Sequence, residues 1–220
     1  MKIVNGSSLP PLSGGSPKQI VLLLHGYGSD GHDMITLASA WQQSLPDALF
    51  LAPHAPQRCD GGSGYQWWGL EALNPQTLAA GAALAAPCIN AFLDRKLQQY
   101  ALSDADVALV GFSQGTMMAL HVGLRRSGRV AAIVGYSGML TASDDLHIEK
   151  MAKPPVLLIH GASDPMIPVA ALHAAETQLR HLGIEVSTHI STGLGHAIDP
   201  EGLRLGRELV VKAFAASKAI

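Results

Sequence analysis

The residue of this chain that most clearly could act in catalysis is a serine between two glycines. Residues 111–115 read Gly-Phe-Ser-Gln-Gly. In such a pattern the glycines let a strand turn sharply into a helix, so that the serine hydroxyl stands clear of the backbone. The apolar run 107–110 before it predicts a strand, and residues 114–126 after it predict a helix. Ser113 is therefore the candidate nucleophile, with an ordinary strand-to-helix turn as the alternative.

A serine hydroxyl is a weak nucleophile at neutral pH and needs a positioned base. The chain has ten histidines, and His196 lies in a Gly-Leu-Gly-His-Ala segment between the last predicted strand and the last predicted helix. A loop at that place can carry the imidazole over the serine. His25 and His160 end predicted strands, where we expect structural hydrogen bonds. Packing or surface positions are expected for the histidines inside predicted helices, His121, His173 and His181.

The base needs an acid that fixes its tautomer and stabilises the imidazolium. Asp164 follows the predicted strand 156–159 directly, in the segment His-Gly-Ala-Ser-Asp-Pro. The order serine, acid, histidine along the chain is that of hydrolases built on an α/β sheet. A turn-forming role before a proline is the alternative for Asp164. Three other acids share the required order but follow a longer loop and resemble a solvated charge cluster: Asp144, Asp145 and Glu149.

Acyl transfer also requires N–H donors for the oxyanion that develops on the substrate. After an elbow, one donor is the backbone N–H of the next residue, here Gln114. The other comes from a loop after an early strand, and residues 24–28, Leu-His-Gly-Tyr-Gly, form that loop. We assign the second donor to the N–H of Tyr27. A phosphate-binding role for this glycine-rich loop is disfavoured because no P-loop lysine follows.

The elements that must position these residues alternate between strands and helices. The expected strands are residues 20–24, 48–52, 107–110, 131–134, 156–159 and, nearer a sheet edge, 185–190. The expected helices are 34–44, 75–99, 114–126, 169–182 and 201–216. We expect Asp33 and Asn74 to cap the first two helices, and Pro87 to kink or split the second. This alternation predicts a mostly parallel sheet with helices on both faces and ligands at the carboxyl ends of the strands.

Composition narrows the class of protein. With 220 residues, 48% of them hydrophobic and 15% charged, the chain is expected to form a single domain over residues 1–220. The net charge of −2 is spread without a basic stripe, so we expect no nucleic-acid partner. Cys59 and Cys88 fit neither a disulfide framework nor a metal motif, and we expect free thiols. Because the N-terminus carries no signal-like apolar segment and the run 79–89 is too short to span a bilayer, we expect a cytoplasmic protein without integral membrane association.

Taken together, the motifs resemble the phospholipase/carboxylesterase family of α/β-hydrolases, which includes the acyl-protein thioesterases. The resemblance rests on residues 24–31, 53–56, 111–115, 160–168 and 195–196, so it spans nearly the whole chain. It implies an α/β-hydrolase fold without a large cap domain, and it implies no cofactor and no metal. The implied catalytic residues are Ser113, Asp164 and His196, with the N–H groups of Tyr27 and Gln114 as oxyanion donors. The residues expected to contact substrate are Trp67, Trp68, Met139, Leu140, Met166 and Ile167.

The chain departs from the family at two places. Thr116 follows the elbow where many members have a second glycine, and Gln66-Trp67-Trp68-Gly69 stands where thioesterases have Ser-Trp-Phe-Asp. The second departure favours a bacterial-type carboxylesterase for short or medium acyl esters. The alternatives are an acyl-protein thioesterase, a serine peptidase or amidase, and a binding protein with a degenerate site. The expected partner is a small ester or thioester, and a homodimer is possible.

Two adjacent tryptophans in the loop from residue 54 to residue 74 bear on the acyl site. Neighbouring residues in extended chain point in opposite directions. We therefore expect one indole, that of Trp67 or of Trp68, to anchor the loop while the other faces the cleft. The alternative is that both are anchors, because an indole buries a large apolar area.

Overall fold

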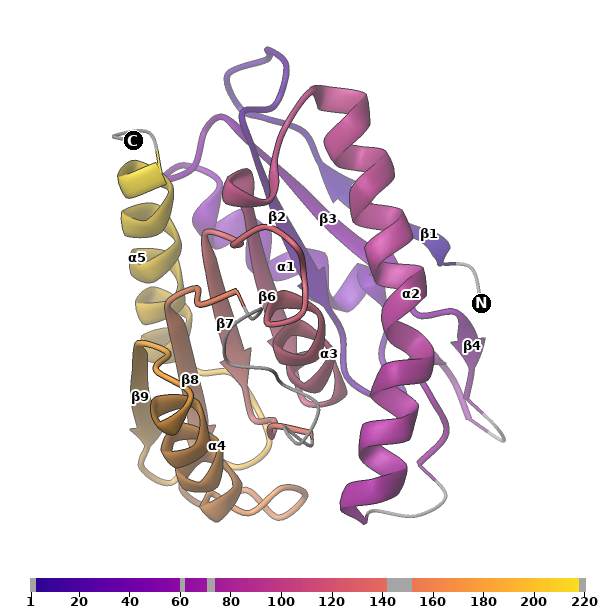
Figure 1. Ribbon diagram of the computed structural model, residues 1–220, viewed down its shortest axis with the longest axis vertical. Coiled ribbons are helices and arrows are strands. Elements are labelled where there is room, and N and C mark those ends of the chain that lie inside the picture. Colours follow the sequence, from indigo (N-terminus) through magenta and orange to yellow (C-terminus); the bar gives the residue numbers. More distant parts are fainter. Residues whose placement is uncertain (1–2, 60–61, 71–73, 142–151, 218–220) are drawn as a thin grey trace.

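The computed structural model describes residues 3–59, 62–70, 74–141 and 152–217. Its centre is a seven-stranded sheet in the order β1-β3-β2-β6-β7-β8-β9 (Figure 1). All neighbouring pairs are parallel except the outer pair β1 and β3. The strands are β1 (Val4–Leu9), β2 (Gln19–Leu24), β3 (Ala48–His54), β6 (Val107–Phe112), β7 (Ala132–Tyr136), β8 (Val156–Gly161) and β9 (Val186–Ser191). A separate two-stranded ribbon pairs β4 (Gln57–Arg58) with β5 (Tyr65–Gln66).

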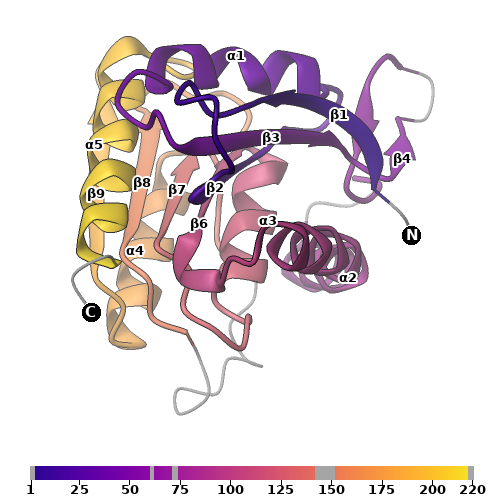
Figure 2. The same cartoon turned by 90° about the horizontal axis from the view of Figure 1, so that it is seen from above.

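Helices cover both faces of the sheet, as Figure 2 shows: α2, α3 and α4 lie on one face, and α1 and α5 lie on the other. Their bounds are α1 (Gly31–Trp41), α2 (Pro75–Tyr100), α3 (Gln114–Gly123), α4 (Ala170–His181) and α5 (Pro200–Ser217), with a short 3₁₀ turn at Asp104–Asp106. Each face has its own apolar cluster against the sheet. The predicted layer arrangement is confirmed, and within the described residues no cap domain interrupts it.

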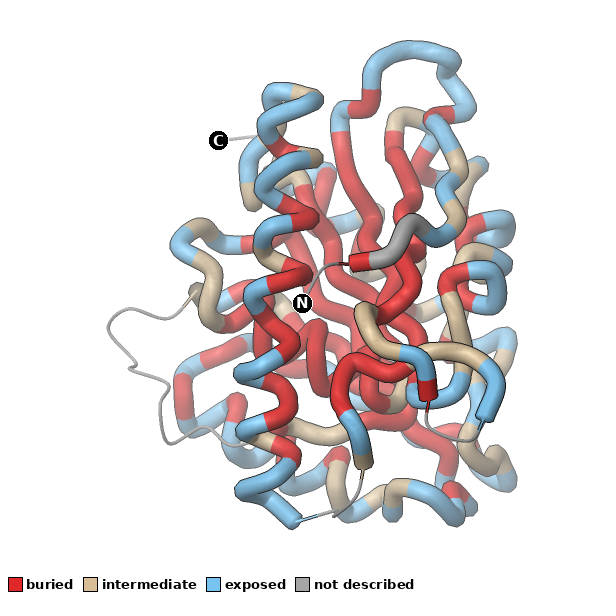
Figure 3. The backbone as a smooth tube through the Cα atoms, turned by 90° about the vertical axis from the view of Figure 1, so that its right-hand side faces the viewer, coloured by how far each residue is buried: buried red, intermediate tan, exposed pale blue. Residues whose placement is uncertain are grey.

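The central strands are buried along nearly their whole length (Figure 3). Every residue of β2 is buried, because helices cover both of its faces, and a parallel strand in that position reads as a continuous apolar run. Each fully buried Leu, Ile or Val side chain stabilises the fold by about 1.5–3 kcal/mol. Strand β9 is mostly exposed between its buried first and last residues, as expected for a strand at the sheet edge.

The predicted bounds of α1 are wrong at both ends, since this helix ends at Trp41 rather than at residue 44, and the predicted end of α3 is also wrong. Helix α1 begins at Gly31, and its N-cap is Asp30, whose side chain accepts hydrogen bonds from the N–H groups of His32 and Asp33. The helix starts there because Asp30 provides the acceptor that its first N–H groups need. Gly31 packs onto the carbonyl of Ala52, where a β-carbon would overlap the oxygen. Helix α3 ends at Gly123, three residues before the predicted end.

Helix α2 begins at the predicted cap, Asn74, whose side chain accepts from the N–H of Thr77. Pro87 does not split it, and the helix runs unbroken to Tyr100. Both Pro87 and Ala83, the residue four positions earlier, are exposed, so the carbonyl that proline leaves without an intrahelical donor faces solvent. By length and composition α2 could cross a membrane, but 44% of its most apolar 18-residue stretch is buried inside the protein. Its buried face packs in the core cluster on that side of the sheet.

Strand β1 was missed by the sequence analysis. Its residues are mostly polar, so they do not form the apolar run by which the other strands were predicted. A strand at the edge of a sheet needs little apolar surface, because one of its faces and its unpaired edge are open to solvent. Cys59 and Cys88 are buried free thiols, as predicted.

Candidate active site

The register of the sheet brings the predicted site segments to one edge. Leu24 at the end of β2 pairs with Gly111 near the end of β6, so the loop after β2 lies beside the elbow. On the other side, Phe112 pairs with Tyr136 at the end of β7. Further along, Gly161 at the end of β8 pairs with Ser191 at the end of β9. Four loops that are distant in sequence therefore meet at the carboxyl edge of the sheet.

Ser113 has the backbone of a nucleophile elbow. Its φ of 55° and ψ of −117° lie in a region that residues with side chains rarely adopt, and helix α3 begins immediately after it. The two glycines are required by contact: a β-carbon on Gly111 would overlap the carbonyl of Gly115, and one on Gly115 would overlap the carbonyl of Leu24. The elbow predicted from the glycine spacing is present.

His196 and Asp164 are joined by a short hydrogen bond. Nδ1 of His196 lies 2.7 Å from Oδ2 of Asp164. The Asp164 side chain is fully buried, and the His196 side chain is 19% exposed. The ring of His196 also lies against the ring of Phe112, with centroids 4.9 Å apart, which places the imidazole next to the elbow. Among the described contacts Ser113 Oγ makes no hydrogen bond to His196, and in ligand-free sites such bonds are commonly long.

The carboxylate of Asp164 is held as an anion. Burial raises its pKa, but hydrogen bonds from the N–H of Ile167, the His196 ring and the N–H of Met166 together lower the pKa below its ordinary value. Both N–H groups donate to Oδ1, at 2.9 Å from Ile167 and 2.8 Å from Met166, which leaves Oδ2 for His196. An ionised acid at this position fixes the proton of His196 on Nδ1 and leaves Nε2 as an acceptor.

His160 makes the structural hydrogen bond expected of it. Its Nε2 lies 2.8 Å from the carbonyl oxygen of Ile167 and 3.3 Å from Oδ2 of Asp164. Because a carbonyl only accepts, the His160 proton is on Nε2 and points at the loop that holds the acid. His160 is 1% exposed, so it supports Asp164 from inside the protein.

The histidine loop is fastened to its neighbours by backbone contacts. The N–H of Ser163 donates to the carbonyl of Leu194 at 2.9 Å. Gly161 packs so closely on this loop that a β-carbon would overlap the carbonyls of Leu194 and Gly195. The hydroxyl of Ser137, which follows β7, lies 3.4 Å from the carbonyl of Ala197. These contacts fix the backbone on both sides of His196.

The loop after β2 lies directly against the nucleophile. A β-carbon on Gly26 would come within 3.1 Å of the β-carbon of Ser113. Gly28 has φ of 79°, and its N–H donates to the carbonyl of Tyr65 at 3.0 Å, so the ribbon β4–β5 holds the turn that contains Tyr27. Gln114 is the first residue of α3, where a backbone N–H has no partner inside the helix. The segments that contain Tyr27 and Gln114 thus adjoin Ser113, and the role of their N–H groups as oxyanion donors stays a prediction.

Gln114 and Trp67 connect the elbow to the tryptophan loop. The Gln114 side chain accepts from the N–H of Trp67 at 3.0 Å and donates to the carbonyl of Trp68 at 2.9 Å. The indole N–H of Trp67 donates to the carbonyl of His25 at 2.9 Å. Trp67 is fully buried and therefore anchors the loop. Trp68 is 5% exposed and packs its indole against Gly81 of α2. Both indoles are therefore buried, which favours the alternative that both anchor the loop over the expectation that one faces the cleft.

His25 makes the predicted structural hydrogen bonds. The N–H of Ala55 donates to its Nε2 at 2.9 Å, so the proton is on Nδ1 and donates to the carbonyl of Gly26 at 2.7 Å. Burial, with a smaller effect of the nearby His54, lowers the pKa of His25, although its bond to Gly26 acts in the opposite direction. A neutral His25 therefore braces the oxyanion loop.

The remaining residues expected to contact substrate follow β7 and β8, whose carboxyl ends lie at the same edge of the sheet as the elbow. Met139, Leu140 and Ile167 are half-buried and pack on the apolar cluster beneath α2, α3 and α4. Met166 is 68% exposed. The sequence analysis missed the contact of Ser137 with Ala197 and the side-chain role of Gln114, and no local pattern marks either one, because the partners lie 60 and 47 residues away.

Comparison with known proteins agrees with this geometry. The sequence pattern of the phospholipase/carboxylesterase family matches residues 13–211. The chain belongs to this family. It is 27% identical over 203 residues to acyl-protein thioesterase 1 of Gibberella zeae, covering 83% of this chain and 85% of that one. It is 26% identical over 187 residues to esterase YpfH of Escherichia coli, covering 85% and 79%.

Among solved structures, the chain is similar to esterase PE8, with a TM-score of 0.90 and 43% identity over 97% of this chain and all of that one. The α/β-hydrolase fold implied by the sequence motifs is thereby confirmed. Membership in the phospholipase/carboxylesterase family places the chain among esterases and thioesterases.

Proposed function

We propose that this chain is a serine carboxylesterase that hydrolyses esters of short to medium acyl chains through an acyl-enzyme. The observation that carries the proposal is the 2.7 Å contact between His196 Nδ1 and the buried, ionised Asp164, beside a serine on an elbow. This arrangement leaves Nε2 of His196 without a proton, as a general base requires.

In the first step Ser113 Oγ attacks the carbonyl carbon of the ester while His196 Nε2 takes the hydroxyl proton. The oxyanion is stabilised by the N–H groups of Tyr27 and Gln114 and by the positive N-terminal end of α3. The imidazolium then gives its proton to the leaving alcohol, and Ser113 is left acylated. Water attacks this acyl-enzyme with His196 again as the base, which releases the carboxylic acid and restores the serine.

The side chains around Ser113 support an apolar acyl group. Met139, Leu140 and Ile167 offer half-buried apolar surface at the rim, and Met166 extends it outward. The same site would cleave a thioester, because a thiolate is a better leaving group than an alkoxide, and relatives are named thioesterases. We place esters first because Gly69 stands where thioesterases carry an acid in this loop.

A fluorophosphonate probe, which modifies an activated serine, tests the proposal. The purified chain should react, and Ser113→Ala should abolish labelling and lower kcat by at least about a thousandfold while leaving the melting temperature close to that of the parent. Matched p-nitrophenyl esters and thioesters from acetyl to dodecanoyl then rank the substrates. Failure of the parent chain to react would instead support a binding protein. Retention of more than about a tenth of the activity by Ser113→Ala would remove this serine from the mechanism.

A further inference from the structure

Thr116, the residue directly after the elbow, occupies the narrow space between the elbow and β7. Its side chain is buried, and its hydroxyl oxygen lies 2.8 Å from the carbonyl oxygen of Gly111 and 2.8 Å from that of Tyr136. A hydroxyl has one proton, so it donates to one of these carbonyls at a time. The carbonyl of Gly111 lies on the strand that enters the elbow, and that of Tyr136 ends the neighbouring strand.

The carbonyl of Tyr136 is shared with the nucleophile. The N–H of Ser113 donates to the same oxygen at 2.9 Å, and the N–H of Thr116 donates to the carbonyl of Ser113 at 3.0 Å. Thr116 and Ser113 are therefore linked directly and through one acceptor. Ser113 has a φ of 55°, a conformation that persists only when surrounding contacts impose it. Thr116 supplies one such contact directly, through its N–H, and a second indirectly, through the hydroxyl that shares the Tyr136 carbonyl with the N–H of Ser113.

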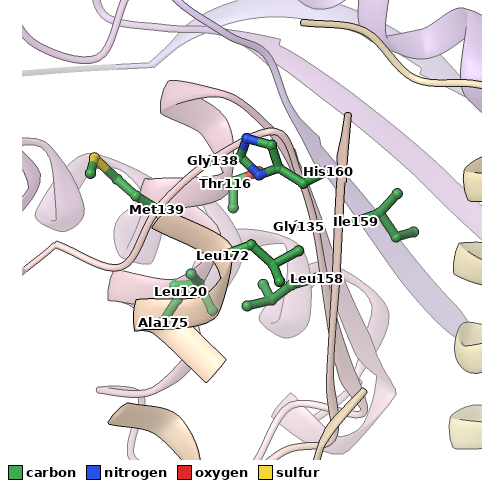
Figure 4. A pocket seen from close by; sticks show the side chains of 10 residues that line it. All are labelled: Thr116, Leu120, Gly135, Gly138, Met139, Leu158, Ile159, His160, Leu172 and Ala175. Carbon is green, nitrogen blue, oxygen red and sulfur yellow. The ribbon is translucent and has the colours of Figure 1, made fainter. Parts of the chain in front are cut away.

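The methyl group of Thr116 fills a space that two glycines leave open. A β-carbon on Gly135 would meet Cγ2 of Thr116, and one on Gly138 would meet its Cβ. Next to this contact lies a small cavity of about 10 Å³, bounded by Thr116, His160 and apolar side chains of α3, β8 and α4 (Figure 4). The cavity holds at most about one water molecule, so the packing around the threonine is nearly complete.

We infer that Thr116 is a positioning residue for Ser113, acting through the backbone and touching no substrate. Its hydroxyl fixes the carbonyls that frame the elbow, and these determine the direction of Ser113 Oγ. The inference rests on the proposed role of Ser113 as nucleophile. Small displacements of a reacting group cost rate steeply, so loss of the hydroxyl should lower kcat more than it alters KM.

Two substitutions separate the hydroxyl from the methyl group. Thr116→Val keeps the shape of the side chain and removes the hydroxyl, and we expect kcat to fall about tenfold or more with KM changed less than about twofold. Thr116→Ser keeps the hydroxyl, so kcat should recover to within about threefold of the parent, while the melting temperature falls because the cavity grows. The control for the exchange itself is Thr177→Val on the exposed face of α4, whose hydroxyl donates to a backbone carbonyl, that of His173 at 2.9 Å.

Active-site titration with the fluorophosphonate probe gives kcat per folded site, so a loss of folded protein cannot imitate a loss of positioning. If Thr116→Val does not fold, Thr116→Ser and Thr116→Ala form a pair that differs by one hydroxyl, and the serine variant should be the faster by about tenfold. Equal kcat in that pair, or a Thr116→Val enzyme as fast as the parent, would overturn the inference. An active Ser113→Ala enzyme would overturn the proposed function instead, so the two failures are distinguishable.

Discussion

The side chain of Gln114 offers a test of how the elbow holds the tryptophan loop. It is 1% exposed and is hydrogen-bonded to two backbone groups, the N–H of Trp67 and the carbonyl of Trp68. Gln114→Met keeps nearly the same length and volume but cannot form either hydrogen bond. The backbone N–H of residue 114, the proposed oxyanion donor, is retained. The substitution therefore tests the side chain separately from the oxyanion site.

The magnitude follows from the two groups left without partners. A buried backbone donor or acceptor that loses its partner costs about 1–3 kcal/mol, so two cost about 2–6 kcal/mol. Methionine has no amide group to desolvate on folding, and this difference returns about 1–2 kcal/mol of the free energy of unfolding. Because methionine fills the same space, no cavity contribution is added. We expect Gln114→Met to lower the free energy of unfolding by about 2.5 kcal/mol, the difference between the midpoints of these two ranges.

Urea denaturation of the parent and of Gln114→Met measures this loss, with Gln98→Met on the exposed face of α2 as the control. The control should change the free energy of unfolding by less than about 0.5 kcal/mol. A loss below about 1 kcal/mol for Gln114→Met would refute the reasoning, because it would mean that Trp67 and Trp68 find other partners or water. In the absence of urea, kcat/KM of Gln114→Met should also be lower than that of the parent, since Trp67 holds the carbonyl of His25.

Three further predictions follow from the same contacts. Gly161→Ala would place a β-carbon on the carbonyl oxygens of Leu194 and Gly195 and so displace the histidine loop, and kcat should fall about a hundredfold. Activity near that of the parent would show that the loop accommodates the methyl group without moving His196. The pKa of Asp164 is lowered in the folded state, so its contribution to stability is complete above the ordinary value of 3.8 and is lost as pH falls below that value. The difference in melting temperature between the parent and Asp164→Asn should therefore be smaller at about pH 3 than at about pH 6, and a constant difference would contradict this. Trp67→Ala should lower kcat/KM at all acyl-chain lengths alike, because the indole of Trp67 holds the carbonyl of His25 beside the elbow. A loss of about 1–3 kcal/mol confined to longer acyl chains would instead mean that this indole contacts the acyl group.

The amino-acid sequence by itself determined most of the elements of the central sheet, the helices that cover it and the local turns. Runs such as 20–24 and 107–110 are continuous and apolar because a parallel strand covered on both faces needs apolar side chains in both directions. The elbow could be predicted because its chemistry is local: the glycines that permit a sharp turn lie within two residues of Ser113. The same holds for Asn74 as a helix cap, since the cap and the N–H that it accepts from are three residues apart.

Contacts between distant segments were decided by the tertiary structure. Both His160 and His196 lie within 3.3 Å of Asp164 Oδ2, and only the packing of their loops places one inside the protein and the other, partly exposed, beside Phe112. The burial of Trp67 depends on Gln114, which is 47 residues away in sequence. Such partners are fixed by the order and register of the strands, in which side chains far apart along the chain become neighbours. A single sequence records each residue's local preference but not that register, and this is why candidate catalytic residues could be named from the sequence while the contacts that hold them could not.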